Sequence, residues 1–373
     1  MKPLREPGGR RIVLTRLLLL LPLLLVLLIP APASSQEVVP SPPAPEAFVP
    51  SAEVHGQLEL QADSGHLGSR SADSSFPTLD GLARFPAATH LAIRRLRLSL
   101  TGHLGRDVDV VVQGHTDSRD DEAQLRDCFV RVRLGEDLSL LAGQFKVRFG
   151  REGLRSSSET LTIERSDMTR ALYQERDLGL NLGGRTDSGF EWDLGTFQGQ
   201  QRNASERNGT KDAACRFVFP VTRELKLGLS GHLGSIRPEG APADTPVRRW
   251  GTDLRYRSGP WTLESEAIWS QGWNGFSKAD TRAFGAYLGA SLAVSPELDV
   301  VAFYDWFDPD LERVDLRTAS NSVNARNRVV LGTSYYLDRA TFHRVTLNYE
   351  IHRPTEGPSL EPDGWRVRYQ FRF

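Results

Sequence analysis

The feature that most constrains this chain is an alternation of apolar and polar side chains with a period of two. Successive side chains of a β-strand point to opposite faces, so this pattern gives a strand one apolar face and one polar face. The strands of a soluble β-sandwich also alternate between apolar and polar side chains. A terminal strand of such a sandwich seldom needs one face that is so aromatic and another that is so uniformly charged. The pattern is clearest at the C-terminus, where arginines and Gln370 alternate with Trp365, Val367, Tyr369, Phe371 and Phe373.

The same alternation recurs in sixteen segments along the chain. Each runs for about ten residues, which is the length that a tilted strand needs to cross a bilayer. In the second segment the apolar parity changes between Ile93 and Leu96, which predicts a β-bulge near Arg94 and Arg95. The predicted strand centres are Gln57, Leu96, Val110, Val130, Phe145, Leu180, Asp193, Phe217, Leu227, Leu254, Glu264, Leu288, Ala302, Leu331, Leu347 and Tyr369.

The links between these segments alternate in length. Tight turns such as 102–105 and 258–260 follow the even-numbered segments, whereas the odd-numbered segments are mostly followed by longer links such as 62–88 and 150–175. Short periplasmic turns and long outer loops are typical of outer-membrane barrels, and an even strand count closes an antiparallel sheet without free edges. We therefore expect an all-β transmembrane antiparallel barrel of about sixteen strands. A lumen of this size holds water, which fits a mean hydropathy of −0.37.

The N-terminus has the order of an export signal. Arg10, Arg11 and Arg16 precede an apolar run at 17–29, and small residues follow it. We expect a signal peptide at 1–33, a Pro-rich linker at 34–50 and the barrel at 51–373. A permanent N-terminal anchor is the alternative, although the run is shorter than the roughly 20 residues that span a bilayer.

Composition and motifs argue against several other classes. The 46 basic and 47 acidic residues leave no basic footprint for nucleic acid. The two cysteines, Cys128 and Cys215, fall on the apolar parity of separate strands, so we expect two lipid-facing thiols and no disulfide. None of the eight histidines forms a zinc-protease motif, and no serine elbow or phosphate-binding loop occurs. We therefore predict no catalytic residues, no cofactor and no metal site.

Three blocks of sequence resemble the phosphate-selective porin O and P family. They are the Arg-Arg strand at 93–98, the Leu-Arg-Asp strand at 125–130 and the segment at 143–166, which contains Gly-Gln-Phe-Lys and Glu-Arg-Ser. Arg148 and Cys128 depart from the usual Pro and Ala of the family. The resemblance implies a sixteen-stranded barrel, usually a homotrimer, that passes phosphate or other anions. Phe373 resembles the C-terminal signal that the barrel assembly machinery recognises.

The lumen-facing parity carries charges that are unevenly distributed. Segments fourteen to sixteen and one to five contribute thirteen basic and six acidic residues, whereas segments six to thirteen contribute five basic and nine acidic ones. We expect a transverse field across the pore, with anions following the cationic wall. The alternative is that the arginines pair with acidic neighbours and keep the lumen wet. The predicted substrate-binding residues are Arg94, Arg95, Arg97, Arg131, Arg133, Lys146, Arg148, Arg151 and Arg165.

The third outer loop, residues 150–175, is unusually apolar for a surface loop, with Leu154, Leu161, Ile163, Met168, Leu172 and Tyr173. We expect it to fold into the barrel and form the constriction, with Lys146, Arg148, Arg151 and Arg165 at its narrowest point. Two simpler interpretations stay open. Glu164 and Arg165 can form an ion pair that pins the loop, and the Ser156–Ser158 run can be an anion-binding element or only a turn.

The function predicted from the sequence is passive diffusion of small inorganic anions through a water-filled porin in the lipid outer membrane of a Gram-negative-type bacterium. The alternatives are a structural or adhesion barrel with a plugged lumen and a non-selective general porin.

Overall fold

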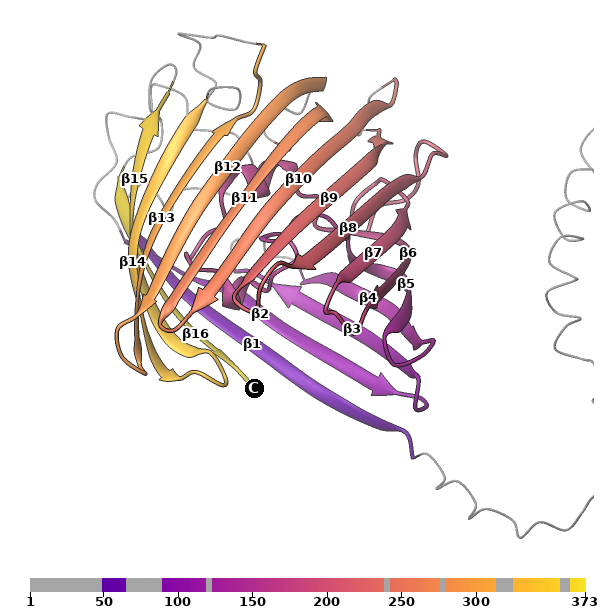
Figure 1. Ribbon diagram of the computed structural model, residues 1–373, viewed down its shortest axis with the longest axis horizontal. Helices are drawn as coiled ribbons and strands as arrows, with labels where there is room; N and C mark the ends of the chain where they lie inside the picture. Colours follow the sequence, from indigo (N-terminus) through magenta and orange to yellow (C-terminus); the bar gives the residue numbers. More distant parts are fainter. Residues whose placement is uncertain are drawn as a thin grey trace, which may run out of the picture. The chain divides into compact units, whose positions relative to one another are not determined.

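The protein folds into a single closed β-barrel (Figure 1). The computed structural model describes residues 49–64, 89–118, 123–237, 242–275, 280–312, 325–355 and 363–373. The predicted signal peptide and most of the predicted linker lie outside the described residues. No helix in the described ranges combines the length and the apolar character that crossing a membrane requires.

Sixteen antiparallel strands form the barrel, and each strand pairs with its neighbours in the sequence. All sixteen predicted centres fall within these strands, so the predicted sixteen-stranded antiparallel barrel is confirmed. The strands are β1 (Ser51–Ser64), β2 (Thr89–His103), β3 (Val108–Thr116), β4 (Ala123–Arg133), β5 (Leu138–Lys146), β6 (Arg176–Arg185), β7 (Glu191–Phe197), β8 (Asp212–Pro220), β9 (Leu225–Ile236), β10 (Thr245–Ser258), β11 (Trp261–Trp273), β12 (Asp280–Ala293), β13 (Leu298–Asp308), β14 (Arg326–Asp338), β15 (His343–Pro354) and β16 (Gly364–Arg372).

The barrel closes between its first and last strands. Gln57 of β1 lies opposite Arg372 of β16, and the Gly56 amide donates to the Phe373 carbonyl at 2.7 Å. The predicted bulge in β2 is also present. Glu59 pairs with Arg95 and the next residue of β1 pairs with Ile93, so Arg94 has no cross-strand partner in β1.

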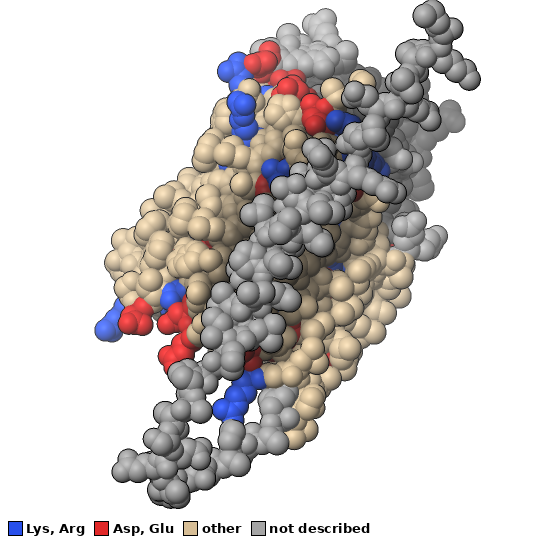
Figure 2. All heavy atoms as spheres, turned by 90° about the vertical axis from the view of Figure 1, so that its right-hand side faces the viewer, with Lys and Arg blue, Asp and Glu red and all other residues tan. Residues whose placement is uncertain are grey.

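Polarity in this barrel is inverted relative to a soluble protein. On β16 the side chains of Arg366 and Arg368 are buried, whereas Trp365 of the same strand is 38% exposed. Leu178 and Leu180 of β6 are exposed, whereas Asp177 and Asn181 of the same strand are buried. Figure 2 shows the consequence on one face, where the charged side chains gather toward the two ends and uncharged residues cover most of the surface between them. An apolar outer face over a polar interior is what a bilayer requires.

The strand bounds confirm the alternation of links. Residues 259–260 alone connect β10 to β11, whereas residues 147–175 connect β5 to β6. The described part of the chain has two helices, η4 (Ser157–Glu159) and α3 (Asp167–Leu172), and both lie in this longest described connection. Cys128 on β4 and Cys215 on β8 are free thiols.

Candidate functional site

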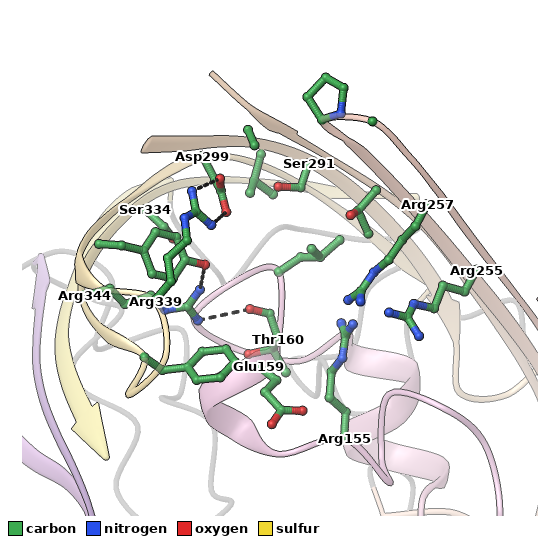
Figure 3. A pocket seen from close by; sticks show the side chains of 18 of the residues that line it. Arg155, Glu159, Thr160, Arg255, Arg257, Ser291, Asp299, Ser334, Arg339 and Arg344 are labelled. Atoms are coloured by element: carbon green, nitrogen blue, oxygen red, sulfur yellow. Dashed lines mark hydrogen bonds and ion pairs between the residues drawn. The ribbon is translucent and has the colours of Figure 1, made fainter. Parts of the chain in front are cut away.

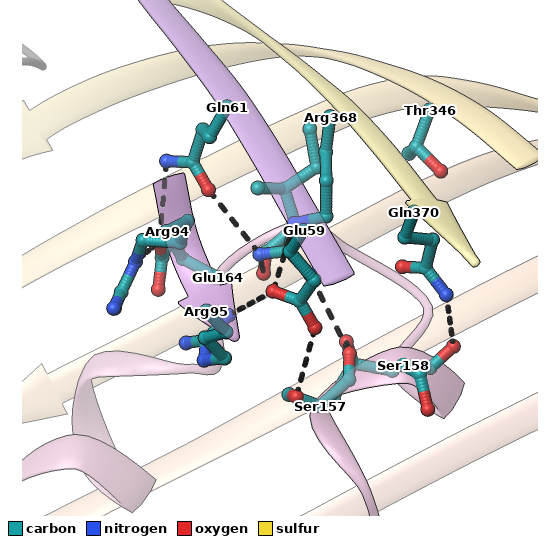
Figure 4. Close-up of polar contacts among 12 residues, drawn as sticks. Glu59, Gln61, Arg94, Arg95, Ser157, Ser158, Glu164, Thr346, Arg368 and Gln370 are labelled. Atoms are coloured by element: carbon teal, nitrogen blue, oxygen red, sulfur yellow. Dashed lines mark hydrogen bonds and ion pairs between the residues drawn. The ribbon is translucent and has the colours of Figure 1, made fainter. Parts of the chain in front are cut away.

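Residues 150–175, here called the third-loop segment, are bonded to inward-facing side chains of many strands. The first contact is with β1 and β2 (Figure 4). The Ser157 hydroxyl donates to the buried carboxylate of Glu59 at 3.0 Å, and Arg95 donates to the same carboxylate. Arg97 donates to the Ser157 oxygen at 3.2 Å. Two of the predicted anion-binding arginines therefore hold the Glu59–Ser157 contact.

Strands β15 and β16 bind the backbone carbonyls of the same segment. Arg368, which is 1% exposed, donates to the carbonyl of Ile163 and lies 3.5 Å from the Glu59 carboxylate. Gln370 donates to the carbonyl of Ser158 at 3.1 Å, and Arg344 donates to the same carbonyl at 3.0 Å. These donors satisfy carbonyls that would otherwise be buried without partners.

The Glu164 carboxylate is the anionic centre of a second contact. Arg94 lies 3.3 Å from it, Gln61 donates to it at 3.4 Å and Arg366 lies 3.9 Å away. Burial alone raises the pKa of Glu164, but attraction from Arg94, Arg95 and Arg366 outweighs burial and holds the pKa well below its usual value. Glu164 therefore stays ionised at neutral pH and pins the segment to β2 and β16. It pairs with these arginines and not with Arg165, as one interpretation of the sequence had it.

Lys146 and Arg165, two of the residues predicted for the narrowest point, also bind the segment itself. The Lys146 ammonium donates to the carbonyls of Gly153, Leu154 and Arg155 at 3.1, 2.8 and 2.8 Å. An ammonium has three donors, so all three are used. Arg165 donates to the carbonyls of Glu152 and Arg155.

Helix α3 packs on an apolar area of the barrel wall. It contacts β11, β12 and β13, and Met168 and Leu172 are fully buried in a cluster that includes Phe303 and Phe307. Glycine makes this approach possible, because a Cβ on Gly285 would lie 2.7 Å from the Cβ of Met168. Burying each of these two side chains stabilises the contact by about 1.5–3 kcal/mol.

The remaining predicted site residues are also paired. Arg133 donates to Asp109, and Arg131 lies 3.6 Å from the same carboxylate. Arg148 lies 3.5 Å from Asp193. Each of the nine basic residues predicted to bind anions thus has a polar partner inside the protein.

A cavity of about 520 Å³ opens beside the segment, at the end of the barrel where the tight turns lie. We call it the basic pocket (Figure 3). Its lining includes the β10–β11 turn at Gly259 and Pro260, and only two of its residues are acidic, Glu159 and Asp299. Six of its residues are arginines: Arg151, Arg155, Arg255, Arg257, Arg339 and Arg344.

Arg255 and Arg257 differ from the other arginines of the basic pocket. Both lie on the inward parity of β10, and among the described residues neither has a hydrogen bond or an ion pair through its side chain. The cross-strand neighbour of Arg255 is Glu264, but Arg151 and Arg155 bind that carboxylate at 2.8 and 2.5 Å. Arg155, Arg255 and Arg257 line the same cavity, and in Figure 3 their side chains point toward one another.

A second cavity, of about 390 Å³, lies toward the long loops. The third-loop segment lines it with Arg170 and Glu175, and β10 contributes Arg249. Arg126 and Arg202 bind the Glu175 carboxylate at 2.8 and 3.0 Å. Burial raises the pKa of Glu175, but attraction from Arg126, Arg176 and Arg202 together outweighs burial and lowers the pKa, so the carboxyl is ionised. The third-loop segment therefore borders an arginine-containing cavity toward each end of the barrel.

Sequence reasoning undervalued the basic pocket. Arg255 and Arg257 lie on the wall for which parity predicts a net negative charge, and parity gives only the sum of charges on that wall. Arg151 and Arg155 of the third-loop segment neutralise Glu264, and strand periodicity does not predict this contact. The only signal was the spacing of Arg255 and Arg257, which places both on one face beside a tight turn.

The fold of this chain is similar to the folds of solved outer-membrane channels and porins. The chain is similar to the outer membrane channel DcaP of Acinetobacter baumannii, with a TM-score of 0.61, 11% identity and coverage of 87% of this chain and 97% of that one. It is similar to an anion-selective porin from Comamonas acidovorans, with a TM-score of 0.58, 13% identity and coverage of 87% and 99%. The trimer form of OmpT from Vibrio cholerae gives a TM-score of 0.58, 9% identity and coverage of 87% and 100%.

The sequence comparison is more specific. The family model for phosphate-selective porin O and P matches residues 67–241, which confirms the resemblance seen in the three motif blocks. No curated protein sequence matches the chain. A porin barrel with this family match indicates a location in the outer membrane.

Proposed function

We propose that this protein is a passive porin for small anions, phosphate or related oxyanions. The observation that carries the proposal is the basic pocket, where six arginines face two acidic residues. Cations that line a narrow channel with low-dielectric walls raise the local concentration of anions and repel cations. The similarity to a Comamonas porin described as anion-selective supports the same function. Diffusion through such a bore needs neither a cofactor nor a catalytic group.

The third-loop segment lies across the bore in this proposal and narrows it. Its bonds to β1, β2, β15 and β16 and the contacts of α3 with β11, β12 and β13 support this position. These contacts tie the segment to well-separated parts of a closed barrel. The two cavities at its margins are then the two approaches to the constriction.

The nine basic residues predicted from the sequence contribute to the field of the bore, and each of them does so while paired with another group of the protein. Arg95, Arg97 and Lys146 fix the segment, and Arg151 faces the basic pocket. We further propose that the chain is exported by a signal peptide, is assembled through a terminal signal at Phe373 and forms homotrimers in the lipid bilayer. The trimer form of the Vibrio cholerae OmpT supports the last point.

A plugged structural barrel is the second candidate, and the dense bonding of the third-loop segment favours it. Recording from single molecules of the purified protein in planar bilayers separates the two functions. A porin gives discrete conductance steps, whereas a plugged barrel gives none. If the bore binds phosphate, adding phosphate to the chloride solution reduces the chloride current. A chloride current that phosphate does not change identifies a general pore.

A further inference from the structure

We propose that Arg255 and Arg257 of β10, together with Arg155, form the solute-contacting anion site, and that the arginine-rich wall of β2, β15 and β16 is a scaffold for the third-loop segment. This inference rests on the proposed anion-porin function. It assigns selectivity to the wall that has the lower formal charge. It therefore reverses the expectation that anions follow the most cationic strands.

The arginines of the scaffold wall are committed to other partners. Arg368 is bonded to the Ile163 carbonyl, Arg344 to the carbonyls of Ser158 and Thr160, and Arg97 to Ser157. These three residues are at least 91% buried. To bind a passing anion they would have to release buried carbonyl or hydroxyl groups, each at a cost of about 1–3 kcal/mol. Their charges contribute to the field, but their donors are occupied.

Arg255 and Arg257 are in the opposite situation. They face a cavity, and no carboxylate of the described residues forms an ion pair with either of them. Arg155 extends toward them from the third-loop segment (Figure 3). Arg155 does have a carboxylate partner, Glu264, but Arg151 shares that single negative charge. The cluster therefore has an excess of positive charge that a solute anion can balance.

The chemistry of the cluster selects oxyanions. A guanidinium presents a planar set of donors that matches a carboxylate or phosphate in a bidentate manner, and neighbouring guanidiniums favour an anion with more than one charge. Inorganic phosphate and small dicarboxylates share this chemistry. The cavity of about 520 Å³ is roomy enough for an anion that keeps part of its water. Binding is then weak enough for release, which a channel requires.

The test compares R255Q/R257Q with R248Q in planar bilayers. Arg248 lies on the same strand, has an exposed outward position and is absent from the basic pocket, so its replacement is a matched charge control. We expect the double variant to lower the anion-to-cation permeability ratio several-fold and to raise the half-blocking phosphate concentration about tenfold. R248Q leaves both values unchanged. Circular dichroism and heat-modifiable migration verify that each variant forms the barrel.

The same recordings use phosphate and succinate as separate probes. Block by phosphate alone identifies an inorganic anion site, and block by both probes identifies a general oxyanion site. Either result supports the inference when R255Q/R257Q raises the half-blocking concentration about tenfold. An anion-selective wild type whose selectivity and block survive in R255Q/R257Q overturns the inference but leaves the proposed function intact. A wild type that forms no channel, or a cation-selective one, overturns both.

Discussion

Glu264 lies opposite Arg255 in the register of β10 and β11, yet its carboxylate is bonded to Arg155 of the third-loop segment. This exchange of partners links the position of the loop to the charge of the basic pocket. It leaves Arg255 without its cross-strand counter-ion and brings Arg155 next to it. The pocket is therefore basic because the loop is in place, and the following predictions separate the two roles.

Removing the Glu264 charge should make the pore more anion-selective. The E264Q variant keeps a hydrogen-bond acceptor for Arg151 and Arg155 but removes the negative charge that both share. The zero-current potential in a KCl gradient should shift further in the anion direction. E191Q, which alters a carboxylate on β7 outside the basic pocket, is the control. A shift of E264Q toward cations would contradict the assignment.

A larger residue at Gly285 should displace α3 from the wall. The Cβ of a valine there would meet Met168 at 2.7 Å, a contact that must be relieved by movement. We expect G285V to cost about 1–3 kcal/mol, as overpacking does, and to change the single-channel conductance. A286V, on the outward parity of the same strand, should change neither the thermal unfolding midpoint nor the conductance. Equal behaviour of the two variants would show that α3 does not pack at this position.

Loss of Arg368 should release the segment from β16. R368Q leaves the Glu59 carboxylate with one fewer cation and the Ile163 carbonyl without its donor. Breaking one member of such a buried network costs roughly 3–5 kcal/mol. Thermal unfolding should report this loss, and the current should become noisy, while its anion preference keeps its sign. A collapse of selectivity with unchanged stability would instead place Arg368 in the conducting path.

The segment should stay attached in mild acid. The pKa of Glu164 is lower in the folded protein than in the unfolded chain, where an ordinary glutamate has a pKa of about 4.3. Its contribution to the free energy of unfolding is therefore complete above the unfolded-state pKa and is lost as the pH falls through the folded-state pKa. The bonds of Glu164 should therefore be unchanged from pH 7 to about 5, and the conductance change that follows from their loss should appear only below about pH 4. E164Q should show the acid-altered conductance already at pH 7. An E164Q variant whose conductance at pH 7 equals that of the wild type would contradict this role of Glu164.

The fold was predictable because lipid and water impose a simple rule on each strand. The two-residue alternation located all sixteen strands, and the parity change between Ile93 and Leu96 located the bulge at Arg94. Alternating link lengths gave the two ends of the barrel. Each of these signals depends on residues that are close together in the chain, so a single sequence is enough to detect it.

The site was less predictable, because it depends on which charges neutralise one another. Parity predicts that Arg95 and Arg97 point inward. It does not predict that Arg95 is bonded to Glu59 and Arg97 to Ser157. After Lys146 the chain leaves the sheet, so parity does not apply to Val147 and Phe149, which are buried in the apolar cluster with α3. The loop arginines that bind Glu264 meet it from more than a hundred residues away in the sequence. No periodic pattern encodes such a contact.

The measurement that tests the account most directly is the zero-current potential of the purified wild-type protein in a planar bilayer with a tenfold KCl gradient. A water-filled bore with a basic pocket should give discrete channels and a potential whose sign shows preference for chloride over potassium. A potential with the opposite sign, or a barrel that conducts no ions, would contradict the account.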